Sequence, residues 1–181
     1  MSFRDLAHNP DVIRALRKLR DIGIYVSLYP VRKNYGIMAF DIYETTKRLL
    51  HDAAKGHIAN YVRPDLEDRK DVMVAVIEVP EYEAMPTPAE ERDRASKELT
   101  DALLRKGIKS MIEIESDTRA YVAIDVDSVA EYVARQTERA LGKNVKHFTF
   151  YDRENRVLQT HVWTGTTPSE VIELKRKVKA R

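Results

Sequence analysis

The stretch that decides the fold runs from Gly107 to Gly142 and reads GIKSMIEIESDTRAYVAIDVDSVAEYVARQTERALG. It holds two strand-like runs and then a helix-like run closed by glycine, a residue that commonly ends helices. An earlier stretch, GIYVSLYPVRKNYGIMAFDIYETTKRLLHDAAKG from Gly23 to Gly56, has the same plan. A shift of 84 positions (107 − 23) places Gly23 on Gly107, Ile24 on Ile108, Ala39 on Ala123 and Asp41 on Asp125. The pattern indicates an internal duplication.

The predicted elements follow the order helix, two strands, helix, two strands, given twice and followed by a closing helix. Helices with one apolar stripe and hairpins with one apolar face predict an α+β fold, a duplicated αββαββ unit plus a C-terminal helix, with antiparallel sheets and helices on one face. We place the first αββαββ repeat at residues 1–84. The second repeat, with the basic C-terminal helix, takes residues 85–181, and we expect the two halves to pack as one compact unit.

Composition limits the class of protein. The chain has 181 residues and no cysteine, which excludes disulfides and thiolate metal sites. No apolar run approaches the roughly 20 residues that span a bilayer, and the start lacks the apolar core of a secretory signal. We therefore expect a cytoplasmic protein with no membrane partner. Charged residues make up 33% and glutamine is rare, which favours a thermophilic source; a melting midpoint of about 45–65 °C would contradict that hypothesis.

Motifs for cofactors and catalysis are absent from the sequence. It has no G-x-G-x-x-G, Walker loop, H-E-x-x-H or G-x-S-x-G, and only 6 glycines. We therefore expect no cofactor and favour a non-enzymatic role. The net charge of +2 permits nucleic-acid binding without requiring it.

The last predicted hairpin, with strands at 145–151 and 157–163, has the most informative outward face. If Arg156 lies opposite Asp152, then His147 lies opposite His161. In that register the inward residues are Phe148, Phe150, Leu158 and Val162. The outward residues are His147, Thr149, Tyr151, Gln159, His161 and Trp163.

A sheet face with aromatic rings, edged by cations, is typical of nucleic-acid binding, because rings stack on bases for roughly 1–3 kcal/mol each and cations hold phosphates. We therefore predict DNA or RNA as the partner. The predicted contact residues are Tyr25, Tyr29, Arg32, Lys33, Arg119, Tyr121, His147, Tyr151, His161, Trp163, Lys175, Arg176 and Lys177.

Other interpretations of the same face stay open. The polar and aromatic residues can be ordinary cross-strand pairs, or the face can be buried between the halves or in a homo-oligomer, which would make the protein an assembly subunit. The His147 and His161 pair suggests a metal ion, but zinc normally needs three or four ligands and no third is evident. A further alternative is a metal-dependent nuclease built on the symmetry-related acids Asp41 and Asp125.

The order of elements resembles that of the LAGLIDADG homing endonucleases, which are also duplicated αββαββ units and which place a sheet on DNA. The resemblance covers nearly the whole chain in element order. Their motif helices end in an acid directly before glycine, whereas here Asp21 is one residue out of place and Lys106 precedes Gly107. The resemblance therefore implies the fold and not the catalytic pair. Roadblock-type interaction domains share the α-ββ-α-ββ order.

Overall fold

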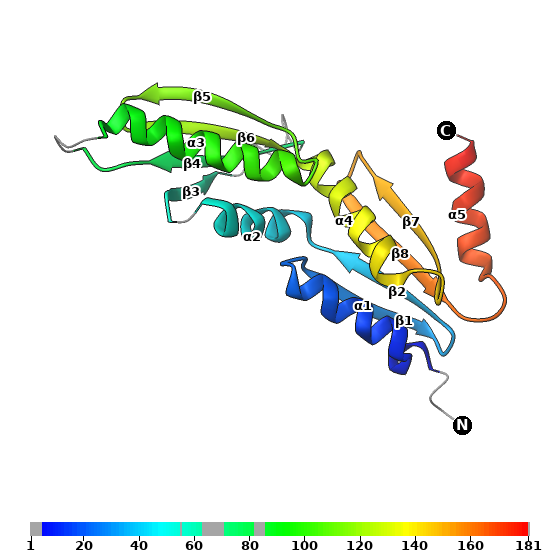
Figure 1. Ribbon diagram of the computed structural model, residues 1–181. Coiled ribbons are helices and arrows are strands. Elements are labelled where there is room, and N and C mark those ends of the chain that lie inside the picture. The colour runs from blue at the N-terminus through cyan, green and yellow to red at the C-terminus, as the bar shows by residue number, and fades with distance from the viewer. Residues whose placement is uncertain (1–4, 55, 63–70, 82–85, 181) are drawn as a thin grey trace. The chain divides into compact units, whose positions relative to one another are not determined.

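The computed structural model describes residues 5–54, 56–62, 71–81 and 86–180, without the side chains of 59–62. After a short 3₁₀ helix, η2 (Leu6–His8), the elements are α1 (Pro10–Asp21), β1 (Val26–Arg32), β2 (Tyr35–Phe40), α2 (Ile42–Ala54), β3 (Ile58–Val62), β4 (Val72–Glu78), α3 (Pro88–Arg105), β5 (Ser110–Ser116), β6 (Arg119–Asp125), α4 (Val126–Leu141), β7 (Lys146–Asp152), β8 (Val157–Trp163) and α5 (Ser169–Lys179) (Figure 1). This order confirms the α+β class and the duplicated αββαββ plan with a C-terminal helix.

Local sequence explains where the helices begin and end. The Asn9 side chain caps α1 by accepting from the backbone N–H of Asp11 at 2.9 Å, and Pro10 suits the first helical position. The Thr87 hydroxyl caps α3 in the same way, 3.3 Å from the backbone nitrogen of Glu90. Gly23 and Gly107 follow the two helices with φ values of 89° and 78°, a conformation that favours glycine.

The strands form two antiparallel four-stranded sheets, and each sheet takes one hairpin from each repeat. Sheet A has the order β1-β2-β8-β7, and sheet B has the order β3-β4-β6-β5. The chain accordingly divides into two compact units, unit 1 (Met1–Asp41 and Val133–Arg181) and unit 2 (Ile42–Tyr132), with α4 passing from one to the other. The repeats at 1–84 and 85–181 therefore describe the order of elements along the chain, whereas the compact units draw one half from each repeat.

The duplication extends to single residue pairs. In the first hairpin Val26 lies opposite Phe40 and Ser27 opposite Ala39; 84 residues later, Ser110 lies opposite Ile124 and Met111 opposite Ala123. Both hairpins have a bulge at the same place, between Pro30 and Arg32 and between Ile114 and Ser116. The shift of 84 residues that relates the two repeats in sequence therefore also relates the strand pairing of their first hairpins.

The predicted register of the last hairpin is wrong by one residue. Asp152 lies opposite Val157 and not Arg156, so His147 lies opposite Val162, and His161 lies opposite Phe148. The turn is one residue longer than expected because Arg156 adopts a positive φ of 54°. Since successive side chains of a strand point to opposite faces, the slip moves every β7 side chain to the other face.

Helices cover the two faces of sheet A unequally. α1 and α4 lie on one face of sheet A (Figure 1). Gly36 faces this side, because a Cβ atom on it would meet Leu6 of η2, which packs against α1. α5 packs on the opposite face, where its Val171 joins a buried cluster with Tyr35 and Trp163. The helices within the repeats follow the expected one-face arrangement, and the C-terminal helix covers part of the face that was expected to be open.

No helix in the described part of the chain is both long enough and apolar enough to cross a bilayer.

Candidate nucleic-acid interface

The outer face of sheet A is the face opposite α1. Strand alternation and the observed register place on it one set of residues, Ser27, Tyr29, Tyr35, Ile37, Ala39, Lys146, Phe148, Phe150, Gln159, His161 and Trp163. Tyr25 extends this face by one position, because its carbonyl accepts from the backbone N–H of Asp41 and continues the ladder. Tyr25 is 46% exposed and Tyr29 is 59% exposed, and Ser27 lies between them, also exposed.

α5 covers the end of this outer face that carries Tyr35 and Trp163. Trp163 is only 4% exposed, packed with Tyr35 and Val171, and Ile37 and Phe148 pack against the three. The Lys175 ammonium lies 5.4 Å from the centre of the Phe148 ring and 5.7 Å from the centre of the Trp163 ring. Trp163 was predicted to be exposed for stacking. That exposure is wrong, and the residue instead anchors the C-terminal helix.

A buried pair of polar side chains lies beneath α5. The Tyr35 hydroxyl is 2.7 Å from Nδ1 of His161, and the two rings stack with centres 5.9 Å apart. Burial raises the pKa of Tyr35 and lowers the pKa of His161, so the neutral form of each is favoured. His161 is 6% exposed, which contradicts the expectation that it lies on an open surface.

Arg32 holds the beginning of α5 to the end of β1. Its guanidinium donates two hydrogen bonds to the Glu170 carboxylate, at 2.6 and 2.9 Å, and lies 5.1 Å from the centre of the Tyr35 ring. The hydrogen bonds from Arg32 lower the pKa of Glu170 to about 2. Arg32 is therefore engaged in positioning α5, while Lys33 in the adjoining turn is exposed.

Further cations of this region lie on α5. Arg176 and Lys177 are exposed, as is Lys179 in the same last turn. The helix that packs on the outer face of sheet A therefore ends in a basic turn.

The equivalent face of sheet B has a different character. Arg119 donates to Glu78 at 2.8 Å and lies 3.7 Å from a carboxylate oxygen of Glu115, and these partners raise its pKa. A hydrogen bond to Glu115 raises the pKa of Tyr121. Glu113 lies opposite Tyr121 and is exposed. Arg119 and Tyr121 thus belong to unit 2, among acids that repel phosphate.

The register slip separates two further predicted residues from the outer face. His147 and Tyr151 lie on the helix side of β7, where both are half-buried, and His147 Nδ1 is 3.0 Å from the carbonyl of Val145. His147 and His161 therefore point to opposite faces of sheet A and cannot bind one metal ion together, which removes that alternative interpretation of the pair. Phe148 and Phe150 take the place of His147 and Tyr151 on the outer face.

Asp41 and Asp125 belong to different units, unit 1 and unit 2. Asp125 accepts from the backbone N–H of Asp127 at 3.2 Å, and burial raises its pKa. Over the described residues there is no group of three or more histidine, aspartate or glutamate side chains arranged to hold a metal ion.

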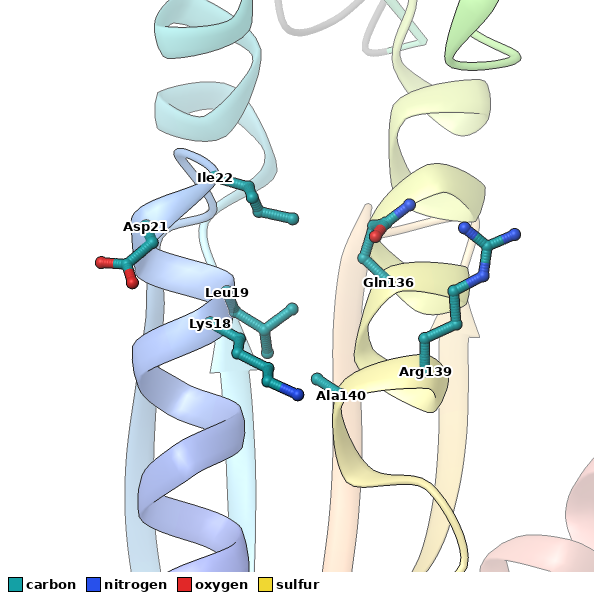
Figure 2. Close-up of a pocket in the computed structure, with 7 residues that line it drawn as sticks. All are labelled: Lys18, Leu19, Asp21, Ile22, Gln136, Arg139 and Ala140. Atoms are coloured by element: carbon teal, nitrogen blue, oxygen red, sulfur yellow. The ribbon is translucent and has the colours of Figure 1, made fainter.

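A groove of about 370 Å³ lies on the helix side of sheet A, between α1 and α4 (Figure 2). Leu19 and Lys18 extend into it from α1, and Ala140 faces them from α4. Asp21 and Arg139 point away from it in Figure 2. Its charged groups do not converge on one point, so the groove is a weaker candidate than the outer face of sheet A.

The chain matches no family model, no curated protein and no solved structure.

Proposed function

We propose that the protein binds nucleic acid on the outer face of sheet A, with bases stacked on Tyr25 and Tyr29 and phosphates held by Lys33, Arg176 and Lys177. The observation that supports this most is the exposure of two tyrosines, 46% and 59%, on the same sheet face to which the basic helix α5 is fixed. Aromatic rings and cations on one open surface supply the two interactions that single strands require.

The spacing of the tyrosines fits a single strand. Tyr25 and Tyr29 project from the same side of one strand, with Ser27 between them, so the two tyrosines are about 14 Å apart along the strand. Stacking needs bases that are not already stacked in a duplex, and an open sheet face leaves room for them. Phe150 and Gln159 lie half-buried on the same face and extend the surface toward β7.

The charge distribution favours unit 1 over unit 2 as the binding surface. Under the duplication, Tyr29 corresponds to Glu113 and Tyr35 to Arg119. Sheet B therefore carries Glu113, Glu115 and Glu78 on the face where sheet A carries rings. This difference supports a nucleic-acid surface on sheet A alone.

Fluorescence anisotropy with labelled single-stranded and duplex DNA and RNA, measured at several salt concentrations, tests the proposal. We expect tighter binding to single strands and an affinity that falls steeply with salt. The variant Tyr29→Ala should bind weakly, and the matched control Tyr121→Ala, on the corresponding face of sheet B, should bind as the wild type does. Equal binding by both variants, or no salt-dependent binding to any nucleic acid, would contradict the proposal.

A further inference from the structure

Among the strands that the structure describes, β5 forms an edge of sheet B, and it is exposed from Met111 to Ser116. Met111 is 76% exposed, Ile112 is 42% and Ile114 is 55%. Leu104 on α3 is 65% exposed. Arg92, near the start of α3, donates to the carbonyl of Ser116 at the end of β5, so α3 lies along this edge. An apolar edge strand of this kind is a template for pairing with another strand.

The backbone of β5 is available for such pairing at alternate residues. The carbonyl of Lys109 accepts from the N–H of Asp125 at 2.9 Å, and the N–H of Lys109 donates to the Ser128 hydroxyl at 3.0 Å. Both groups of Lys109 therefore point into the sheet. By alternation, Ser110, Ile112 and Ile114 direct their N–H and C=O groups toward the free edge.

The duplicated hairpin supplies an internal comparison. β1 is the edge strand of sheet A that corresponds to β5, and the two hairpins share the same register and the same bulge. The position equivalent to Ile114 is Pro30, which has no N–H to offer at the free edge. Proline therefore interrupts backbone hydrogen bonding at the free edge of β1, whereas the equivalent residue of β5, Ile114, has an N–H group to donate.

We infer that β5 pairs with β5 of a second copy of this chain in an antiparallel, two-fold arrangement centred on Ile112. In this register Ile112 lies opposite its counterpart, and Ser110 lies opposite Ile114 of the other copy. All three outward-pointing residues then exchange backbone hydrogen bonds. Just beyond each end of this pairing, on the outer side of the sheet, Lys109 comes near Glu115 of the other copy, twice by symmetry, which brings two pairs of opposite charge together.

Neighbouring registers fit less well. Centring the two-fold axis on Glu113 would place two glutamates against each other, which is destabilising. Centring it on Met111 would leave Ile114 outside the set of three paired residues. The bulge after Ile114 twists the strand and ends the ladder there, which agrees with a pairing that spans residues 110–114.

Sedimentation velocity over a wide range of protein concentration tests this inference, and it does not depend on nucleic-acid binding. The wild-type mass should rise from 20.9 kDa toward twice that value as concentration increases. Ile114→Pro should stay monomeric and keep its fold, since Pro30 already occupies the equivalent position. If that variant is not folded by circular dichroism, Ile112→Lys replaces it, because two lysines would meet at the two-fold axis.

The matched control is Ile172→Lys, on α5, because Ile172 is also 42% exposed. It should dimerise like the wild type. A wild-type chain that stays at 20.9 kDa at every concentration, or a folded Ile114→Pro that still dimerises, would overturn the inference.

Charge reversal tests the register. Lys109→Glu alone should weaken the dimer by about tenfold, because it lies near Glu115 of the other copy. Lys109→Glu combined with Glu115→Lys should restore it. The two residues are too far apart along one strand to compensate within a single copy, so rescue is expected only across the interface. A combined variant no tighter than Lys109→Glu would overturn the proposed register.

Discussion

Tyr35 and His161 lie diagonally across the β2–β8 ladder on the outer face of sheet A, with the hydroxyl of one 2.7 Å from Nδ1 of the other. Nε2 of His161 is buried and has no hydrogen-bond partner among the described residues. The bond to Tyr35 is therefore the one that satisfies this ring. We expect Tyr35→Phe to lower the free energy of unfolding by about 1–3 kcal/mol, because it leaves a buried polar group unpaired.

Urea denaturation followed by the emission of Trp163 measures this effect, since Trp163 is the chain's one tryptophan. Tyr29→Phe is the control, because Tyr29 is 59% exposed, and it should unfold as the wild type does. Removing both partners in Tyr35→Phe with His161→Phe should cost less than the sum of the single changes. A Tyr35→Phe variant as stable as the wild type would show that the hydrogen bond contributes nothing.

The ion pair between Arg32 and Glu170 predicts that α5 is released by acid. Arg32 lowers the pKa of Glu170 from 4.5 to about 2, so the carboxylate is more acidic in the folded protein than in the unfolded chain. The stabilisation is therefore fully present above pH 4.5 and is lost as the pH falls toward 2. We expect the emission of Trp163 to shift to longer wavelength in this window, because α5 covers that ring.

Glu170→Gln is the comparison for this pH dependence. It lacks the titrating group, so the difference between its emission profile and that of the wild type isolates the contribution of Glu170 from those of other carboxylates. Two profiles that coincide between pH 4.5 and 2 would show that the pair does not hold α5.

The first hairpin could be predicted from sequence because two departures from regular pairing cancel. The sequence predicts this hairpin with a three-residue turn and Val31 opposite Tyr35, which would pair Ser27 with Ala39 and Tyr29 with Ile37. Both pairs are present in the structure. The turn is one residue shorter than predicted, with Arg32 opposite Tyr35, but the bulge at Val31 adds that residue back to β1. Apolar alternation along the strands fixes the same register in either case.

The last hairpin could not be predicted in the same way. Its β7 strand, KHFTFYD, has aromatic residues at alternate positions and polar residues that suit either face, so alternation does not choose between the two registers. The choice depends on one left-handed residue, Arg156, and arginine has no preference for that conformation that a sequence reveals. β8 was assigned to the correct faces because Leu158 and Val162 define its core side.

The position of α5 could not be predicted from the sequence either. Its basic last turn predicted an exposed helix, and that turn is exposed. Its docking depends on Val171 meeting Tyr35 and Trp163 from other elements, a contact that local patterns do not specify. Of the residues predicted to lie on an open face, Tyr25 and Tyr29 are exposed, whereas His161 and Trp163 are covered.

Adding a single methyl group at Gly36 is predicted to destabilise the fold. A Cβ atom there would lie 3.0 Å from Cδ2 of Leu6, 3.1 Å from Cδ1 of Leu28 and 3.3 Å from the carbonyl oxygen of Tyr29. We expect Gly36→Ala to destabilise the fold by about 1–3 kcal/mol, because the core is already filled at this point. The equivalent residue in the second repeat is Ala120, which shows that the hairpin itself accepts a methyl group.

Combining Gly36→Ala with Leu6→Ala separates crowding from backbone effects in urea denaturation. Leu6→Ala removes the nearest contact, so the double variant should lose less stability than the two single variants together. Additive losses would indicate that crowding against Leu6 is not the cause.

The salt dependence of nucleic-acid binding should identify which residues contact phosphate and which contact bases. We expect Arg176→Ala and Lys177→Ala each to reduce the slope of log affinity against log salt by about 0.7, the value for one phosphate contact on a single strand. Tyr29→Ala should leave the slope unchanged and weaken binding by about 1–3 kcal/mol, because stacking releases no counterions. Lys97→Ala, an exposed cation on α3 in the other unit, is the control and should change neither quantity. If Lys97→Ala reduces the slope as much as Arg176→Ala does, the phosphate contacts are not confined to unit 1 and the proposed interface is wrong.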